Sequence, residues 1–503
     1  MNYFKSNTIR FILILLTLSI AFLIAHINNL NDLPIGMHSW AQSDRYAIAL
    51  NYLNEDNIFT PKTNALYTEE GKVGVEFSGI AYVSAKIAVL LKSENHLPFI
   101  FKCLQLFLLV LLLSLFLTTI YNYNAVNSLI NFLLWFASPL LLYYGFNFIP
   151  DSLGLGFAIC SLGYYYEYYK KGESNYLLLA VVLGCFGGLS KLPVLIYPIA
   201  FLTHQAFLKL KAKKMERLEI VLLLSGFFMV LGVLIYDYVF LIDANNRLWS
   251  VIFMGKPNPI LNFNDLTNAL KGISFWRFEF FNLFQFMALV ILMAFLIYKV
   301  KLIPVFFKEL SVIVLIGLLF YFIGLGKQLI HHDYYFLSSF LPFILFAATL
   351  QTKQLLYLTK NKYKVALLIV SIAVSFNSFN QAEARQHEYY TIRDNTLDNN
   401  LLWLKNGDQK LSEAGVGKNE VIFVLYDFAP NTSLVYFNRK GLVFNHEQMS
   451  RKEPHIEFWL EKLKPNYLVV KADWEVDFFR DKPEMARTWT RIPQDGFILY
   501  KRP

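Results

Sequence analysis

Charged residues are scarce in this chain of 503 residues. Asp, Glu, Lys and Arg make up 17% of it, whereas a soluble globular chain carries about 25%. Hydrophobic residues reach 56%, and the mean hydropathy is +0.41. This balance excludes a soluble enzyme of this length. The dominance of apolar residues also excludes intrinsic disorder, and the absence of a glycine period excludes a collagen-like chain.

Cysteine is equally rare, and several common motifs are missing. The three cysteines, Cys103, Cys160 and Cys185, lie inside apolar runs at spacings that fit neither a disulfide framework nor a metal site. No Gly-x-x-x-x-Gly-Lys-Ser/Thr run occurs, which excludes a P-loop ATPase. Gly154-x-Gly156 lacks the third glycine of a dinucleotide site, and no Gly-x-Ser-x-Gly elbow occurs. The chain shows no internal repeat or low-complexity tract.

Long apolar runs dominate what is present. A bilayer core about 30 Å thick is crossed by roughly 20 apolar residues in a helix. About eleven runs meet this length, and no small-residue cleavage site follows the first, which we therefore interpret as an uncleaved anchor. The runs lie near residues 9–27, 97–120, 125–149, 151–169, 175–189, 191–208, 218–242, 279–298, 309–328, 334–351 and 364–380.

The distribution of positive charge predicts how these spans are oriented. The net charge is +9, but the lysines and arginines cluster in short loops between apolar runs, which favours cytoplasmic retention of those loops over nucleic-acid binding. With the N-terminus inside, the loops near residues 170, 209–217, 299–308 and 353–364 all fall inside. Counting Gly79–Leu91 as a span would break the pattern, so we predict an interfacial helix there.

The expected architecture is a mostly α-helical, polytopic membrane bundle with a small C-terminal extracytoplasmic α/β domain. The transmembrane domain would cover residues 1–380, with a first outer loop at 28–96, and the outer domain would cover residues 381–503. A second outer loop would span residues 243–277. In the outer domain, the alternation and residue types predict a helix at 456–463 and strands at 420–428, 433–444, 466–471 and 496–501.

The unusual polar residues fall on the outer side of this topology. Asp44 lies in the first outer loop, Asp151 and Lys191 each open a span, and His331-His332-Asp333 precedes another span. A transporter would more often place such groups near the midplane of the membrane. Their position predicts chemistry at the boundary between the lipid and the external medium.

Each of these residues has a structural and a functional interpretation. Asp44, with Ser43, would cap a helix, or it would serve as a functional carboxylate beside Arg45. Lys191 would snorkel to the interface, or its amine would bind a phosphate, with Arg45 as a second candidate. Asp151 would cap its helix and face the helix dipole, or it would orient Lys191 or Arg45 or help to hold an acceptor.

The histidines leave three alternatives open. His331, His332 and Asp333 would bind a divalent metal, or one histidine would contact phosphate or sugar, or the segment would be an interfacial cap with Tyr334 and Tyr335 as belt residues. Adjacent side chains diverge, which argues against one shared ion.

Three further groups of residues have simple interpretations. The acidic residues of the first loop are expected to be solvated. The aromatic and basic residues of the second loop would either stack on sugars or anchor the chain at the interface. One Asn-x-Ser motif fits a glycosylation acceptor. These are Glu69, Glu70 and Glu76; Arg247, Trp249, Lys256, Trp276 and Arg277; and Asn431-Thr432-Ser433.

Five motifs together resemble a known family. The chain is similar to polytopic glycosyltransferases of the GT-C fold that use lipid-linked sugars, including bacterial relatives of protein O-mannosyltransferases and lipid A aminoarabinose transferases. In the first loop, Ala41 stands between Trp40 and Gln42 where the family often has a Trp-Arg-Gln run. The matching motifs are the first loop at residues 36–46 and 76–82 with Ala85, Phe148-Ile149-Pro150-Asp151, Gly188 to Pro193, His331 to Tyr335 with Pro342, and Pro430 to Gly441.

The resemblance implies an activity and partners. It makes Asp44 the catalytic base in an inverting transfer of a sugar from a polyprenyl-phosphate donor to an acceptor hydroxyl. A single carboxylate suffices for this, because phosphate leaves without strong acid assistance. The acceptor would be a lipid, a glycan or a protein, and a divalent metal is the one cofactor to consider. The candidate substrate-binding residues are Arg45, Asp151, Lys191, His331, His332 and Tyr335.

The expected location is a bacterial inner membrane, with the N-terminus cytoplasmic, membrane lipids around the bundle and no nucleic-acid partner. The alternative function is a transporter or flippase of lipid-linked saccharides, which would share the lipid substrate and need no catalytic base.

Overall fold

The computed structural model describes residues 2–213, 217–237, 239, 258–298, 304–387, 401–427, 429–445, 448–449 and 455–503. The chain divides into two compact units. Unit 1 comprises Met1–Asn29, Lys102–Phe240 and Lys256–Ala384, and unit 2 comprises Leu30–Phe101, Leu241–Gly255 and Arg385–Pro503. The predicted class, a mostly helical chain with a small sheet near the C-terminus, is confirmed. The first long loop, however, folds with the C-terminal region, a grouping that the apolar pattern does not reveal.

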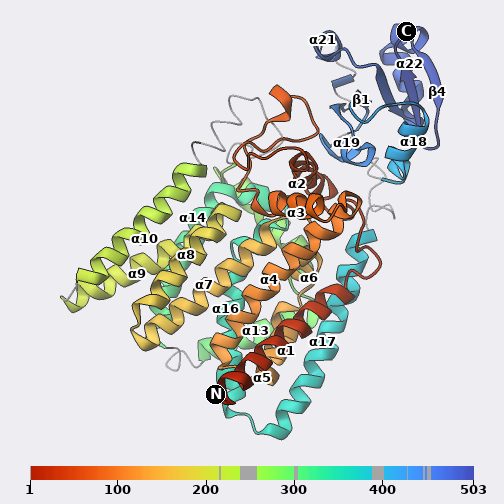
Figure 1. Ribbon diagram of the computed structural model, residues 1–503. Helices are drawn as coiled ribbons and strands as arrows, with labels where there is room; N and C mark the ends of the chain where they lie inside the picture. The colour runs from red at the N-terminus through yellow and green to blue at the C-terminus, as the bar shows by residue number, and fades with distance from the viewer. Residues whose placement is uncertain are drawn as a thin grey trace. The chain divides into compact units, whose positions relative to one another are not determined.

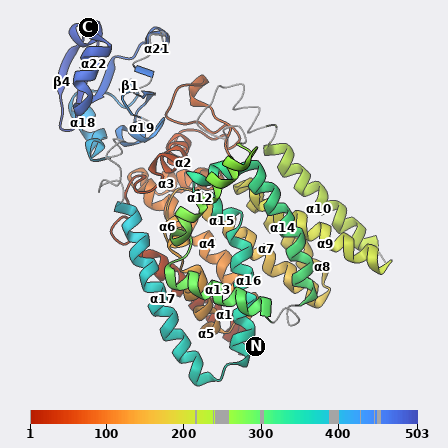
Figure 2. The same ribbon diagram turned by 180° about the vertical axis from the view of Figure 1, so that it is seen from behind.

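Unit 1 is a bundle of apolar helices. In Figure 1, α8, α9 and α10 lie beside one another next to α7, and Figure 2 shows α14 and α16 from the other side. The helices are α1 (Asn2–Ile24), α4 (Leu97–Tyr121), α5 (Ala125–Asn131), η3 (Phe132–Phe136), α6 (Pro139–Gly145), α7 (Asp151–Lys171), α8 (Ser174–Ser190), η4 (Leu192–Leu195), α9 (Ile196–Ala212), α10 (Arg217–Tyr236), α12 (Phe263–Phe280), α13 (Leu283–Tyr298), α14 (Val305–Leu325), η7 (Gly326–Ile330), α15 (Tyr335–Ser338), α16 (Leu341–Leu358) and α17 (Asn361–His387).

Length and composition make this a multi-pass membrane protein. Among the described residues, six helices are long and apolar enough to cross a bilayer, or up to eight if each of two bent helix pairs is one span. The prediction was about eleven runs of spanning length. Beyond the two bent pairs, three of the predicted spans account for the difference. The helix α8 has only 17 residues. The helix α7 carries tyrosines, a glutamate and lysines, and α16 carries two glutamines and a lysine, and these residues lower the hydropathy of both helices. The spans are Asn7–Ile24, Glu94–Tyr121, Leu192–Ala212, Glu219–Tyr236, Val305–Ile330 and Asn361–Gln386.

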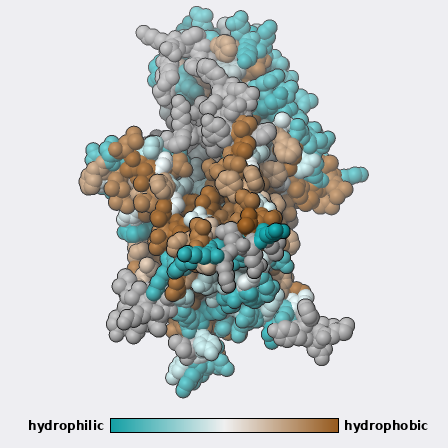
Figure 3. Space-filling view, turned by 90° about the vertical axis from the view of Figure 1, so that its left-hand side faces the viewer, coloured by the Kyte–Doolittle hydropathy of each residue, from teal (hydrophilic) through white to brown (hydrophobic). Residues whose placement is uncertain are grey.

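Large apolar side chains remain exposed on these helices. Phe228 on α10, Ile291 on α13 and Phe320 on α14 are 63%, 66% and 72% exposed. Hydrophobic residues gather in broad brown patches on the face shown in Figure 3. A soluble monomer rarely exposes apolar patches of this kind, so the natural environment of this surface is lipid.

Both bends in the helix pairs are stabilised by polar side chains. The α5–α6 pair bends by 98° and the α12–α13 pair by 109°. Ser138 caps α6 at the first bend. At the second, Asn282 and Gln285 each accept from the other's backbone N–H, and the Gln285 amide donates to the Leu134 and Ala137 carbonyls at 3.0 Å. These bonds satisfy the backbone groups that a broken helix frees inside a membrane protein.

Unit 2 combines two helices from the first loop with a five-stranded sheet. The stretch expected to form an interfacial helix is helical and forms α3, and its position at a membrane interface stays a prediction. The elements before the sheet are α2 (Ser39–Tyr52), η1 (Glu69–Gly71), α3 (Gly79–Leu90), η2 (Glu94–His96), η8 (Leu401–Leu404) and α18 (Gly407–Glu413). The others are β1 (Val421–Leu425), α19 (Thr432–Phe437), β2 (Lys440–Phe444), α21 (His455–Leu463), β3 (Tyr467–Lys471), η9 (Ala472–Trp474), α22 (Glu475–Asp481), α23 (Pro483–Thr488), β4 (Thr490–Pro493) and β5 (Phe497–Lys501).

The sheet has the strand order β2-β1-β3-β5-β4. Its first three strands are parallel, and β5 runs antiparallel to both β3 and β4. The predicted strand at 433–444 is wrong over its first half, which forms α19. Asn438 ends that helix with φ of 48°, a left-handed conformation that Asn tolerates and a strand does not contain. The short strand β4, whose residues are mostly exposed, was not predicted.

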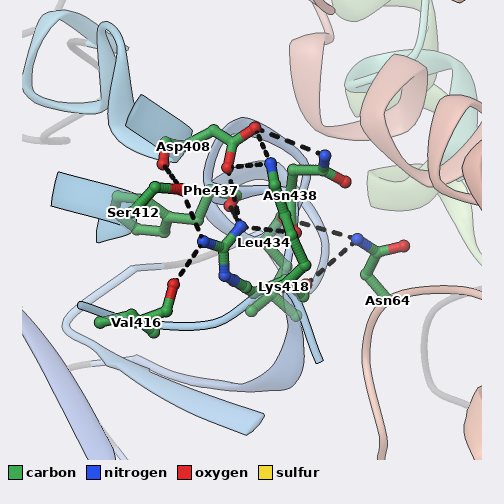
Figure 4. A network of polar contacts seen from close by, with 9 residues as sticks. Asn64, Asp408, Ser412, Val416, Lys418, Leu434, Phe437 and Asn438 are labelled. Carbon is green, nitrogen blue, oxygen red and sulfur yellow. Dashed lines mark hydrogen bonds and ion pairs between the residues drawn. The ribbon is translucent and has the colours of Figure 1, made fainter. Parts of the chain in front are cut away.

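A buried arginine holds the C-terminal fold together. The side chain of Arg439 has 0% exposure and faces Asp408 at 2.7 Å. Its second guanidinium nitrogen donates to Ser412 Oγ at 3.0 Å and to the Val416 carbonyl at 2.8 Å. Figure 4 shows these groups converging from α18 and from the segment between α19 and β2. Burial of this charge is tolerated because both terminal guanidinium nitrogens are hydrogen-bonded.

We predict that Arg439→Met destabilises the C-terminal domain by about 1–3 kcal/mol, because the Phe437 and Val416 carbonyls lose their buried hydrogen bonds to the guanidinium. The measurement is pulse proteolysis of the full chain in urea. Lys418→Ala is the matched control. Lys418 pairs with the same carboxylate but its side chain is 55% exposed, so its loss is expected to cost less than about 1 kcal/mol. Equal effects of the two variants would contradict the account.

Candidate functional site

Asp44 lies within a helix and does not cap one. The helix α2 begins at Ser39, and its N-cap is His38, which has φ of 55°. The Gln42 amide, one turn into the helix, donates to the carbonyls of Ile35 and Met37 at 3.0 Å each. These bonds tie the preceding loop to the start of α2. The capping interpretation of Asp44 and Ser43 is therefore wrong.

The Asp44 carboxyl is buried with an amide as its partner. The residue is 3% exposed, and Asn431 Nδ2 donates to Asp44 Oδ1 at 2.8 Å. Burial raises the pKa of Asp44 to about 7, although the Asn431 hydrogen bond and the neighbouring Arg45 charge both act to lower it. A carboxyl with a pKa near the working pH can take up a proton and release it again, which suits a general base.

Arg45 belongs to an ion pair in the same unit. One of its guanidinium nitrogens lies 2.5 Å from Glu76 Oε2. Glu76 was expected to be a solvated charge, and that expectation is wrong, because the residue is only 8% exposed. Glu69 and Glu70 do lie at the surface, with side chains 76% and 58% exposed. In the sequence, Glu76 differs from the other two because it opens the segment 76–82 that resembles the GT-C family.

Asn431 is a partner of Asp44 whose role its local sequence does not indicate. It occurs in the Asn-Thr-Ser motif of a glycosylation acceptor, but it is fully buried and therefore closed to modification. Its Oδ1 accepts from the Ala65 backbone N–H at 3.0 Å, while its Nδ2 faces Asp44. Asn431 thus connects the first loop to the C-terminal domain, over 387 residues of sequence.

In unit 1, Asp151 and Lys191 form a buried ion pair. Lys191 Nζ lies 3.4 Å from Asp151 Oδ2, and the two side chains are 9% and 0% exposed. Ser338 Oγ, on α15, donates to Asp151 Oδ1 at 3.1 Å. The N-cap of α7 is Pro150, so Asp151 is the first helical residue and its carboxylate is directed to Lys191. Snorkelling of Lys191 is wrong, whereas the predicted contact between the two residues is present.

Aromatic rings cover the amine of Lys191. Its Nζ lies 5.0 Å from the ring centre of Tyr335 and 5.9 Å from that of Tyr334. A cation is attracted to the faces of such rings. The amine therefore lies among one carboxylate and two tyrosines, and three of the predicted substrate-binding residues, Asp151, Lys191 and Tyr335, lie together.

The two histidines have different surroundings. The ring of His332 lies 5.4 Å from that of Tyr335, so it borders the Lys191 cluster. His331 is exposed, and Asp333 is directed elsewhere, accepting from the Tyr144 hydroxyl at 2.7 Å. In the part of the chain that the structure describes, no three His, Cys, Asp or Glu side chains are grouped to hold a metal ion. The geometry of these three neighbours does not support one shared ion.

Of the candidates between residues 243 and 277, Trp276 and Arg277 lie in the described part of the chain. Trp276 is 7% exposed, and its indole N–H donates to the Ile330 carbonyl at 3.1 Å. Arg277 lies over the Phe278 ring at 4.5 Å. Stacking of Trp276 on a sugar ring is therefore not supported, and its role is to fix η7 just before His331. Arg247, Trp249 and Lys256 lie outside the described residues.

The comparisons with known proteins identify the family. A family model described as the Alg9-like mannosyltransferase family matches residues 78–399, which is more than half of the chain. The chain belongs to the Alg9-like mannosyltransferase family. The match includes Asp151, Lys191 and Tyr335 and excludes Asp44 and Asn431. The predicted resemblance to GT-C glycosyltransferases is confirmed, and the chain is a membrane glycosyltransferase. This finding favours a glycosyltransferase over the alternative function, a transporter or flippase of lipid-linked saccharides.

Solved structures of low sequence identity share the fold of this mannosyltransferase-family chain. ArnT from Cupriavidus metallidurans bound to undecaprenyl phosphate is 12% identical with a TM-score of 0.59, and 97% of each chain is covered. The apo oligosaccharyltransferase from Archaeoglobus fulgidus is 13% identical with a TM-score of 0.54, covering 94% of this chain and 70% of that one. No curated protein matches the sequence.

We predict that Lys191→Met lowers the stability of the purified chain in detergent by about 3–5 kcal/mol, because Asp151 would remain buried without its cation. Adding Asp151→Asn removes the stranded charge, so the double variant is expected to recover most of the loss. The thermal unfolding midpoint measures both. Lys170→Met is the control, since that amine pairs with Glu167 while its side chain is 39% exposed. Additive effects of the two site substitutions would contradict the pairing.

Proposed function

We propose that this glycosyltransferase moves a sugar from a polyprenyl-phosphate donor to an acceptor hydroxyl at the outer face of the membrane, with inversion at the anomeric carbon. The observation that carries the proposal is the Asp44 carboxyl, which is buried, bonded to an amide and has a pKa of about 7. Such a group accepts a proton at neutral pH without holding it permanently.

The reaction has one bond made and one broken at the sugar. The acceptor oxygen attacks the anomeric carbon and passes its proton to Asp44, while the bond from that carbon to the phosphate oxygen breaks. Polyprenyl phosphate leaves with the bonding electrons. Attack from the face opposite the leaving group inverts the centre. One carboxylate suffices, because the phosphate needs charge stabilisation and no strong acid.

Lys191 is proposed to stabilise the phosphate. Its amine is a compact cation with three N–H donors, and such a cation suits a phosphate. Asp151 would hold the amine in place, with Tyr335 and His332 beside it. ArnT was solved with undecaprenyl phosphate, which supports a lipid phosphate as the donor's carrier. Arg45 and His331 stay candidates for substrate contact.

The sugar and the setting follow from the family and the charge pattern. The name of the family favours mannose, so polyprenyl-phosphate mannose is the donor to test first, and the acceptor class is a lipid, a glycan or a protein. The positive-inside pattern supports a cytoplasmic N-terminus and an extracytoplasmic C-terminal domain, as in a bacterial inner membrane. The domain boundary near residue 380 belongs to the same proposal.

We predict that Asp44→Asn slows sugar transfer in proteoliposomes by about a hundredfold or more, because the acceptor then lacks its base. In the wild type, kcat/KM is expected to rise with pH to a plateau, with its midpoint near the Asp44 pKa of about 7, since the base acts only when ionised. Glu69→Gln, which alters an exposed carboxylate of the same loop, is expected to change neither rate nor pH profile. An active Asp44→Asn variant with a normal acid limb would refute the proposal.

We predict a separate effect on the donor when Lys191 is changed. The double variant Asp151→Asn/Lys191→Gln leaves no stranded charge, yet it is expected to raise KM for the polyprenyl-phosphate sugar by about tenfold or more, since a charged hydrogen bond to phosphate is lost. Lys170→Gln serves as the control within unit 1. An unchanged donor KM in a folded double variant would exclude Lys191 as the phosphate ligand and leave the role of Asp44 intact.

A further inference from the structure

We propose that Asn431 is a positioning residue for the catalytic base, so that the C-terminal domain takes a direct part in the reaction by fixing the direction of the Asp44 carboxylate. This inference rests on the proposed function, in which Asp44 is the base. It goes further, because it assigns to the C-terminal domain a role in the chemical step itself.

The amide of Asn431 can face Asp44 in only one way. The Ala65 backbone N–H is a donor only, and it bonds to Asn431 Oδ1 at 3.0 Å. The amide nitrogen must therefore lie on the other side, where it donates to Asp44 Oδ1 at 2.8 Å. Because Asn431 is fully buried, water does not compete for either bond. A carboxylate held through one oxygen presents its second oxygen in a fixed direction.

Asn64 holds the loop and the domain around this contact. Its Nδ2 donates to the carbonyls of Arg439 at 3.1 Å and Leu434 at 3.4 Å, and its Oδ1 accepts from the Asn51 side chain at 2.9 Å. In Figure 4, dashed lines mark the hydrogen bonds from the Asn64 amide to these carbonyls. Asn51 lies two turns after Asp44 on α2, so the same helix is attached at both places.

Backbone pairing adds to the attachment. Ala65 bridges Gly441 in parallel with the edge strand β2, with bonds from Gly441 N to Asn64 O at 3.0 Å and from Leu66 N to Gly441 O at 2.8 Å. No Cβ would fit at Gly441, where it would lie 1.7 Å from the Ile422 carbonyl oxygen. The loop thus extends the sheet, and the position of Ala65, which orients Asn431, is determined by the sheet.

The neutral amide is a suitable partner for a base. An ammonium or guanidinium in its place would hold the carboxylate ionised and weaken it as a base, whereas an apolar residue would leave it protonated. The titratable or charged side chains on α2 and its cap, on α3 and on α19 are His38, Asp44, Arg45, Tyr46, Tyr52, Tyr82, Lys86 and Tyr436. Of these, Arg45 is paired with Glu76 and Lys86 with Asp56.

The test compares pH profiles of kcat/KM for sugar transfer by the full chain in proteoliposomes, with polyprenyl-phosphate mannose as donor. Asn431→Ala removes the donor to Asp44, so the acid limb is expected to move to higher pH by about one unit, with a plateau about tenfold lower because the carboxylate is no longer aimed. Asn431→Asp keeps the shape of the side chain and the oxygen that accepts from the Ala65 N–H, but it places a second carboxyl against that of Asp44. The acid limb is therefore expected to move further to higher pH than in Asn431→Ala.

Two controls separate positioning from general damage. Tyr67→Phe removes a hydrogen bond between the same loop and the Val443 carbonyl of β2 without touching Asp44, and it is expected to leave the acid limb in place. Asp44→Asn separates the two proposals. If that variant is inactive while both Asn431 variants keep the wild-type acid limb, the positioning role is refuted and the base is retained. If Asp44→Asn stays active, the proposed function falls, and this inference with it.

Discussion

A carboxyl group buried beside a neutral amide is the constraint on which the site depends. The hydrogen bond from Asn431 to Asp44 requires that the first loop and the C-terminal domain fold as one unit. The asparagine side chains, the bridge to β2 and the buried Arg439 all contribute to that requirement. The docking supplies the amide partner of the buried Asp44 carboxyl.

The second buried aspartate has the opposite environment. Asp151 faces an ammonium and a serine hydroxyl, so its charge is balanced and its geometry fixed. Two carboxyls whose surroundings differ in this way are suited to different tasks, one to proton transfer and the other to holding a cation. The distinction comes entirely from the partners, since both residues are almost fully buried.

The sequence predicts the local features of this protein well and the distant contacts poorly. Apolar runs gave the helices, and α3 was correctly separated from the spans. The bends at Ser138 and Asn282 were missed, because polar residues that cap a break look like ordinary polar residues within a span. The segment 433–444 was predicted as one strand because its composition is β-rich, although Asn438 divides it.

The candidate site shows the same contrast between local features, which the sequence predicts, and distant contacts, which it does not. The candidates Asp44, Asp151 and Lys191 stood out because charged residues are rare in an apolar chain. Their partners did not stand out. Asn431 lies 387 residues from Asp44, and in the sequence its Asn-Thr-Ser motif merely fits a glycosylation acceptor. Ser338 and Glu76 have common residue types in unremarkable surroundings. Partners of this kind become visible only when the fold brings them together.

The most direct measurement is the titration of the Asp44 carboxyl itself in the purified full chain. Infrared difference spectra between acid and alkaline pH, with the Asp44→Asn variant subtracted, isolate the carbonyl stretch of this one group. The account predicts that the protonated band disappears with a midpoint near pH 7, as the pKa of about 7 requires. A midpoint near the ordinary aspartate pKa of about 4 would show that the carboxyl is solvated, and would contradict the buried base on which the mechanism rests.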